Sequence, residues 1–379
     1  MDFSFTKQET LFLQMIREFA ENEVKPLAAE VDEEERYPIE TVEKMGKIGL
    51  MGIPVPTQYG GAGGTNIMYG MAVEELSRVC GTTGVILSAH TSLCCAPIME
   101  HGTEEQKMKY LPKLASGEWI GAFGLTEPNA GTDAAGQQTT AVLDGDEWVL
   151  NGNKIFITNG SYAHVFIIFA MTDKSLGTKG ISAFIVEKGA PGFSIGKKEK
   201  KMGIRGSATT ELVFEDCRIP KDNLLGQLGK GFSIAMKTLD GGRIGIASQA
   251  LGIAQGAIDE TVKYTKERKQ FGKPIAKFQN TQFQMADLET KVQAARLLVR
   301  SAHYKKDMGL PYSADAAMAK LFCAETAMEV TTKAVQFHGG YGYTREYPVE
   351  RMMRDAKITE IYEGTSEVQR MVIAGKLFK

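Results

Sequence analysis

Apolar residues recur at helical spacing through the first third of the chain. Thr6-Lys7-Gln8-Glu9 has the sequence of a capping box, and an apolar stripe follows it at Leu11, Phe12, Met15, Ile16 and Phe19. Similar patterns predict helices over 39–49 and 67–79, and a second capping box at Thr103 begins a helix that runs to Leu114. The glycine-rich stretch 58–65 lacks the spacing of a nucleotide-binding fingerprint. Residues 1–120 are therefore predicted to form a helical domain.

The pattern changes near Ile120 from helical spacing to short strand-like runs. Segments 139–143, 147–150 and 154–158 are separated by Asp144-Gly145 and Asn151-Gly152, which are typical hairpin turns. Further strand-like runs cover 165–171, 181–186 and 211–214. We expect a compact β domain over 121–225.

Long helical patterns return from Phe232 onward, rich in Ala, Leu, Met, Lys and Glu. They cover 247–266, 281–308, 314–337 and 368–377. One continuous apolar stripe is typical of a bundle core and comprises Leu288, Val292, Ala295, Leu298 and Val299. We expect a C-terminal helical domain over 226–379, so that the fold class is α+β with helical, β and helical domains in that order.

Composition narrows the possible functions. The 44 basic and 46 acidic residues are mixed along the chain, so no basic stripe predicts nucleic-acid binding. The start, Met1 to Lys7, does not have the pattern of a secretory or transit leader, and no apolar run was expected to approach the ~20 residues of a membrane span. The five cysteines and five histidines show no metal or disulfide spacing. We therefore expect a cytoplasmic protein with reduced thiols and no metal site.

The stretch Tyr362-Glu363-Gly364-Thr365-Ser366 interrupts helical sequence on both sides. Gly and β-branched Thr are poor helix formers, and here they follow a carboxylate directly. One interpretation is a general base beside exposed backbone N–H groups. From these residues alone, the simpler interpretation is a turn that caps the next helix.

The same stretch resembles the signature of the acyl-CoA dehydrogenases, flavoenzymes that oxidise acyl-CoA thioesters to trans-2-enoyl-CoA. Four more segments resemble family motifs in the family's order, and the likeness covers essentially the whole chain: 125–133, 159–160, 268–272 and 336–340. The short-chain, or butyryl-CoA, branch is the most similar. The resemblance implies an N-terminal helical domain, a middle β domain and a C-terminal four-helix bundle, with the active site where they meet.

The resemblance implies a role for individual residues. Glu363 matches the catalytic base, because the position that carries the base in other branches is Gly242 here. Oxidation across Cα–Cβ also needs a hydride acceptor that no side chain provides, and the family uses FAD. The residues that match the flavin loop and the strand over the ring are Phe123, Leu125, Thr126, Gly131, Thr132, Phe156, Ile157 and Thr158. Phe156 departs from the family, which more often has Trp there.

Other matches concern the rest of the cofactor and the substrate. The remaining FAD residues are Arg268, Phe271, Gln279, Gln336, Gly339, Gly340, Thr365 and Glu367, with segment 336–340 supplied by a neighbouring subunit. His338, inside that segment, is expected near a ligand. The substrate residues are Thr132, Asp240, Arg243, Tyr362 and Gly364.

We expect Asp240-Gly241-Gly242-Arg243 to open the long helix, with Asp240 as a possible N-cap, and Ile246 or Gln249 to limit acyl-chain length. On this basis the leading hypothesis is a short-chain acyl-CoA dehydrogenase, a homotetramer built as a dimer of dimers. A branched-chain or glutaryl enzyme, an oxidase and a non-catalytic flavin-binding assembly factor are the alternatives. The chain has no iron–sulfur spacing and no nicotinamide fingerprint, and the family passes electrons to an electron-transfer flavoprotein.

Overall fold

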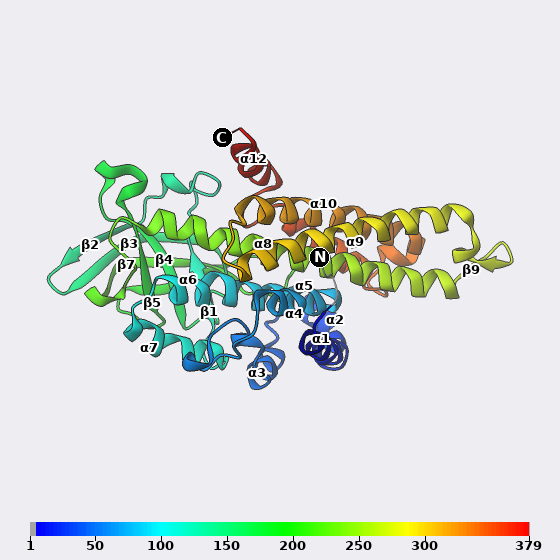
Figure 1. The fold of residues 1–379 in the computed structure, drawn as a ribbon, viewed down its shortest axis with the longest axis horizontal. Helices are drawn as coiled ribbons and strands as arrows, with labels where there is room; N and C mark the ends of the chain where they lie inside the picture. The colour runs from blue at the N-terminus through cyan, green and yellow to red at the C-terminus, as the bar shows by residue number, and fades with distance from the viewer. Residues whose placement is uncertain (1–4, 379) are drawn as a thin grey trace.

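The computed structural model describes residues 5–378. The expectation about a leader concerns Met1 to Lys7, most of which lies outside the described residues. The predicted order of helices, sheet and helices is confirmed (Figure 1). The N-terminal helices are α1 (Lys7–Phe19), α2 (Ala28–Glu33), α3 (Ile39–Lys47), α4 (Asn66–Val79), α5 (Gly81–Ala89), α6 (Ala96–His101) and α7 (Glu104–Ala115). Both predicted capping boxes are present, at Thr6 and at Thr103.

The segment Gly81–His101 was not predicted. It runs from α5 through a π-helical stretch into α6, and residues 81–98 are buried on all sides, so it has no contrast between an apolar and a solvent-exposed face to detect. By length and composition this segment could cross a membrane, contrary to the expectation that no such run exists. Its most apolar window is 94% buried, as is usual for a helix in a protein core.

One mixed sheet forms the middle of the chain. Its strands are β1 (Gly121–Gly124), β2 (Thr140–Asp144), β3 (Glu147–Thr158), β4 (Val165–Met171), β5 (Ile181–Glu187), β6 (Phe193–Lys198), β7 (Thr209–Pro220) and β8 (Leu224–Leu225). The strand order is β6-β7-β3-β2-β4-β5-β8, and β1 pairs in parallel with β4.

Two features of the sheet bear on the predicted strands. Asp144-Gly145 forms the predicted hairpin turn, with Gly145 at a φ of 62°. The turn predicted at Asn151-Gly152 was wrong, because β3 continues through these residues with a register shift against β7. A bulge absorbs the irregular residues without ending the strand.

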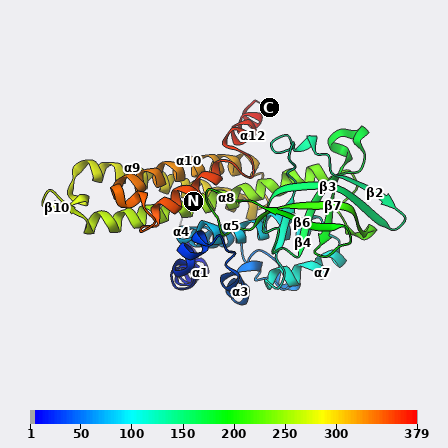
Figure 2. The ribbon, with the colours of Figure 1, turned by 180° about the vertical axis from the view of Figure 1, so that it is seen from behind.

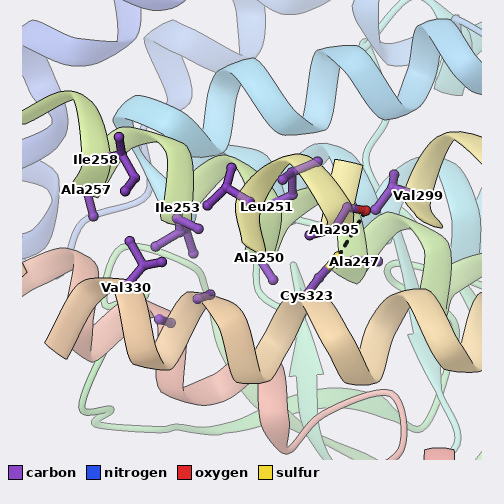
Figure 3. Close-up of a cluster of buried hydrophobic side chains, with 14 of the residues drawn as sticks. Ala247, Ala250, Leu251, Ile253, Ala257, Ile258, Ala295, Val299, Cys323 and Val330 are labelled. Atoms are coloured by element: carbon purple, nitrogen blue, oxygen red, sulfur yellow. Dashed lines mark hydrogen bonds between the residues drawn. The ribbon is translucent and has the colours of Figure 1, made fainter. Parts of the chain in front are cut away.

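The long helices pack side by side at the other end of the molecule. They are α8 (Gly231–Glu267), α9 (Gln279–Asp307), α10 (Ser313–His338) and α11 (Val349–Lys357), and a two-stranded turn, β9 (Lys269–Gln270) with β10 (Lys273–Pro274), joins α8 to α9. Figure 3 shows how Ala250, Ala257 and Ala295 bring the helix backbones together around larger residues such as Leu251. Such close-packed apolar contact is the main stabilising term of a bundle.

The helix α8 connects the two ends of the molecule. Its first residue, Gly231, lies against the backbone of Ser182 in β5, and farther along it packs on α4 and α10. Figures 1 and 2 show the sheet at one end, the bundle at the other, and α12 (Ser366–Leu377) projecting from the body near their junction. The predicted signature at 362–366 lies at the base of this projecting helix.

Candidate active site

The turn between α11 and α12 places Glu363 in an unusual backbone conformation. A 3-10 turn (Ile358–Glu360) follows α11, and then Glu363 and Gly364 have φ values of 52° and 92°. A left-handed conformation at a residue other than Gly costs of order 1–3 kcal/mol and is often retained at functional sites. Thr365 accepts a hydrogen bond from the Val368 N–H and caps α12, so the capping interpretation of this stretch is confirmed.

One oxygen of the Glu363 carboxylate has no hydrogen-bond partner in the part of the chain that the structure describes. This atom, Oε2, is buried. Burial raises the pKa of this carboxyl to about 7, against the opposing influence of Lys320 and Arg243. A buried carboxylate with a pKa near neutrality is suited to accept a proton from a ligand.

The carboxylate faces the middle of α8 at Gly242. A Cβ on Gly242 would lie 2.1 Å from Glu363 Oε2 and 2.9 Å from Leu93 Cδ2. The structure therefore brings together the two positions that the sequence interpretation weighed for the base. A side chain at 242 and the carboxylate of Glu363 could not both occupy this space unchanged.

The expectation that Asp240 to Arg243 opens the long helix was wrong. The helix begins at Gly231, and the continuous hydrogen-bonded turns from there carry the glycine pair into its interior. Asp240 is consequently not an N-cap; its Oδ1 accepts a hydrogen bond of 2.5 Å from Arg243. Arg243 itself is buried, and its Nε has no partner among the described residues.

The loop 125–133 is anchored from below by a buried ion pair. The Lys154 ammonium donates to Glu127 Oε1 (2.7 Å), to the Leu125 carbonyl (3.2 Å) and to Gln137 Oε1 (3.1 Å). Burial opposes ionisation of Glu127, but the charge of Lys154 and the hydrogen bonds from Lys154, Gln138 and Thr139 together hold the pKa of Glu127 below its ordinary value. The anchored loop leaves Thr132 exposed and Thr126 half-buried, while Phe123 and Leu125 are partly and fully buried beneath it.

The adjacent strand presents Phe156 to the outside. Phe156 has a φ of 59° and is 60% exposed, whereas Ile157 is buried and Thr158 is half-buried. The Ile155 N–H donates to the Thr126 carbonyl (2.9 Å), so strand and loop are held together. A bulky, strained aromatic side chain at the surface is unusual and indicates a contact face for a ligand.

The remaining cofactor candidates lie at the far end of the bundle. Tyr264 near the end of α8 stacks on His338 at the end of α10, and Arg268 lies over the ring of Tyr341 at 5.6 Å. Exposed candidates near these two helix ends are Arg268, Phe271, Gln279, Gln336, Gly339 and Gly340. His338 itself is buried. It is hydrogen-bonded to the Ala334 carbonyl and stacks on Tyr264, so its contacts in this chain are those of a packed side chain.

Two separate groups of candidates therefore exist on one chain. Arg268 directly follows the last residue of α8 and is roughly 39 Å along the helix from Gly242, at 1.5 Å of rise per residue. The resemblance implies that Arg268 and Gln279 contact the pyrophosphate and adenosine end of FAD and that a neighbouring subunit supplies segment 336–340. In the structure these residues of one chain lie at the same end of the bundle. A ligand contacting both groups on a single chain would have to span most of the length of α8.

Three residues near Glu363 were not singled out by sequence reasoning. Lys320 Nζ donates to the Gly364 carbonyl (2.6 Å), Gln369 Nε2 donates to the same oxygen (2.8 Å), and Leu93 lies against Gly242. A lysine inside the alanine-rich run of α10 is the one available signal, because a charge among buried positions usually has a specific partner. Gln249, predicted only as a pocket residue, accepts a hydrogen bond from Tyr362 and donates to the Gly81 carbonyl.

The residues around Glu363, in the loop 125–133 and at Phe156 fit a bound flavin. Phe156 offers an exposed aromatic face, a Cβ on Gly131 would meet no neighbouring atom, and the N–H of Glu363 has no acceptor in the part of the chain that the structure describes. Glu367 is exposed at the start of α12, and Tyr362 and Gly364 are half-buried on either side of the candidate base. No cluster of His, Cys, Asp or Glu suited to a metal ion occurs within residues 5–378.

Comparison with known families gives matches along most of the chain. Models of the acyl-CoA dehydrogenase N-terminal, middle and C-terminal domains match residues 6–118, 122–217 and 229–378. A short-chain specific acyl-CoA dehydrogenase of Clostridium acetobutylicum is 68% identical over 379 residues, which is all of both chains.

Solved structures are similar to the same extent. Butyryl-CoA dehydrogenase from Megasphaera elsdenii has a TM-score of 0.98 and 53% identity, covering 100% of both chains. A chain from a structure of the electron transferring flavoprotein of Acidaminococcus fermentans, described in connection with flavin-based electron bifurcation, has a TM-score of 0.99 and 58% identity, again over 100% of both chains.

Proposed function

This chain belongs to the acyl-CoA dehydrogenase family, and on that premise we propose a function and a role for each candidate residue. The protein is an FAD-dependent short-chain acyl-CoA dehydrogenase that converts butyryl-CoA to crotonyl-CoA and passes the electrons to an electron-transfer flavoprotein. The observation that carries the mechanism is the buried Oε2 atom of Glu363, which has no hydrogen bond within residues 5–378 and lies opposite Gly242.

Glu363 is proposed as the base that removes the α-proton of the thioester. The carboxylate must be ionised to accept a proton, and its pKa of about 7 provides a large ionised fraction at neutral pH without making it too weak a base. The free N–H of Glu363 is available to donate to the thioester carbonyl, which stabilises negative charge as the α-proton leaves. Gly242 has no side chain, which allows the Glu363 carboxylate to lie close against α8.

Bound FAD supplies the acceptor for the hydride that leaves the β-carbon. We assign the ring end of the cofactor to the loop and strand that carry Thr126, Thr132 and Phe156. The bundle tip with Arg268 and segment 336–340 is assigned to the FAD of a neighbouring subunit in a homotetramer, because it lies too far from Glu363 along α8. The planar guanidinium of Arg268 is suited to bidentate hydrogen bonds with a diphosphate.

Two organisational proposals accompany this function. We propose domain boundaries at 120/121 and 225/226. The middle domain then begins with β1 and ends with β8, and the C-terminal domain begins shortly before α8. We also propose that the protein acts in the cytoplasm. The five cysteines are free and buried, which suits a reducing compartment.

Adding butyryl-CoA to the FAD-loaded protein without oxygen tests the function directly. We expect the flavin absorbance to bleach and crotonyl-CoA to form in equal amount. Re-oxidation should be rapid with electron-transfer flavoprotein and slow with air, and rapid re-oxidation by air alone would identify an oxidase. Absence of bleaching with butyryl-CoA but bleaching with glutaryl-CoA or a branched acyl-CoA would overturn the substrate assignment.

A further inference from the structure

A single lysine lies beneath the turn that carries Glu363. Lys320 is in the middle of α10, and its side chain is completely buried, although most buried residues of this helix are apolar or small. Its Nζ donates to the Gly364 carbonyl at 2.6 Å, and this is the one hydrogen bond it makes within residues 5–378. A buried ammonium without a paired carboxylate is costly, so its retention needs a specific reason.

The Gly364 carbonyl is held by a second donor from another helix. Gln369 of α12 is buried, and its Nε2 donates to Gly364 O at 2.8 Å and to Glu363 O at 3.3 Å. These contacts hold two successive residues, Glu363 and Gly364, that both have positive φ. Because such a conformation persists only when its surroundings fix it, α10 and α12 together determine where the carboxylate points.

We propose that Lys320 is a positioning residue for the base: its ammonium fixes the Gly364 carbonyl and supplies the positive charge that favours ionised Glu363. This inference rests on the proposed function, because it assumes that Glu363 removes a proton. It goes further by assigning to a residue outside the family signature both the geometry and the protonation state of the base.

The charge of Lys320 is less neutralised than that of the other nearby cation. Arg243 is paired with Asp240 at 2.5 Å, whereas the partner of Lys320 is a neutral carbonyl. The ionisable groups coupled to Glu363 or Lys320 from the surrounding elements are Tyr69, Arg243, Lys320, Glu360, Tyr362, Glu363 and Glu367. Burial lowers the pKa of Lys320 to about 8, with Glu363 the largest influence in the opposite direction. The two groups therefore favour each other's charged forms.

Replacing Lys320 separates the two parts of the proposal. Lys320→Met removes both the donor and the charge, Lys320→Gln keeps a donor without charge, and Lys320→Arg keeps the charge. With Met or Gln, the pKa on the acidic side of the kcat profile should rise by about one unit, which makes kcat roughly fivefold lower at pH 7. Lys320→Arg should leave that pKa unchanged, and KM for butyryl-CoA should change less than kcat in the Met and Gln variants.

Lys201→Met is the matched control. Lys201 also donates to a backbone carbonyl, that of Ser207 at 2.8 Å, and burial lowers its pKa to about 8, but the cations that influence Glu363 are Lys320 and Arg243. This variant should keep the pH profile of the parent. Hydrogen exchange of the amides in 361–365 adds a readout that does not depend on turnover, and it should accelerate in Lys320→Met but not in Lys201→Met.

The outcomes distinguish the inference from the proposed function. If the parent protein does not oxidise butyryl-CoA, the proposed function is wrong. The inference is wrong if the parent is active while Lys320→Met or Lys320→Gln, when folded, shows the same pH profile and the same amide exchange as the parent. In that case Lys320 does not position or tune the base. If Lys320→Met does not fold, Lys320→Gln and Lys320→Arg still decide the role of the charge, and Gln369→Met should lower kcat without shifting its pKa.

Discussion

Glu363 and Gly242 occupy opposite sides of one small space, and a Cβ on Gly242 would come within 2.1 Å of the Glu363 carboxylate. The glycine belongs to the interior of α8 and the glutamate to the turn before α12. The absence of a side chain on the helix therefore makes room for the carboxylate that the later turn provides.

Gly242→Ala should reduce activity without reducing stability. The new methyl group must displace the end of the Glu363 side chain and Leu93, while Ala gains up to about 1 kcal/mol of helix propensity over Gly. We expect kcat with butyryl-CoA to fall at least about tenfold, since small misplacements of a catalytic group are costly. The melting temperature should change by no more than a few degrees.

Gly256→Ala is the control for that substitution on the same helix. A Cβ there would lie 2.0 Å from the carbonyl oxygen of Arg78, which is backbone and cannot move aside as a side chain can. We expect a clear loss of thermal stability, with kcat per folded, flavin-loaded molecule close to that of the parent. An equal loss of kcat in both variants would mean that Gly242 has no special relation to the base.

Glu363→Gln should abolish flavin reduction and also stabilise the protein at alkaline pH. Loss of a general base typically lowers rate by about 10²–10⁴-fold, and rapid mixing with butyryl-CoA measures it. Because the folded pKa of about 7 exceeds the ordinary value of 4.5, the folded protein binds a proton that the unfolded chain releases between those pH values. Stability of the parent therefore falls as pH rises through this window.

Gln at position 363 is neutral at every pH and avoids that loss. Glu363→Gln should match the parent near pH 4.5 and be more stable above pH 7, by at most about 3.5 kcal/mol at about 1.4 kcal/mol per pKa unit. Denaturant unfolding at pH 5 and pH 8 checks this. Parental flavin reduction in the variant would show that another residue is the base.

Lys154→Met should release the flavin loop. It leaves the Glu127 carboxylate buried without its cation, a change that costs about 3–5 kcal/mol for a buried pair. We expect lower stability and faster loss of FAD, followed by flavin fluorescence. The double variant Lys154→Met/Glu127→Gln should recover part of the stability, because no unpaired charge remains, and failure to recover any would argue against the ion pair as the cause.

Ile246→Ala should shift the preference toward longer acyl chains. Ile246 is completely buried on α8, four residues after Gly242 and thus on the same face of the helix. Shortening it should raise the ratio of kcat/KM for octanoyl-CoA to that for butyryl-CoA, at a stability cost of about 2–5 kcal/mol for the cavity. An unchanged ratio would place the limit on chain length elsewhere, for example at Gln249.

The sequence by itself determined the order of the three regions and the elements with clear local signals. Capping boxes at Thr6 and Thr103, the Asp144-Gly145 turn and the interruption around Gly364 depend on short-range chemistry, so they are visible within a few residues. Together with the family resemblance, these signals were sufficient to select Glu363 as the candidate base.

Tertiary structure decided what depends on contacts between distant segments. The helical segment 81–101 is buried on all sides over residues 81–98 and has no contrast between an apolar and a solvent-exposed face, so periodicity could not reveal it. The helix α8 starts at Gly231, where it packs against Ser182 of β5, and not at Asp240. Likewise, Lys320 and Gln369 converge on the Gly364 carbonyl from two helices, and Arg268 is separated from Glu363 by most of α8, because folding sets these distances.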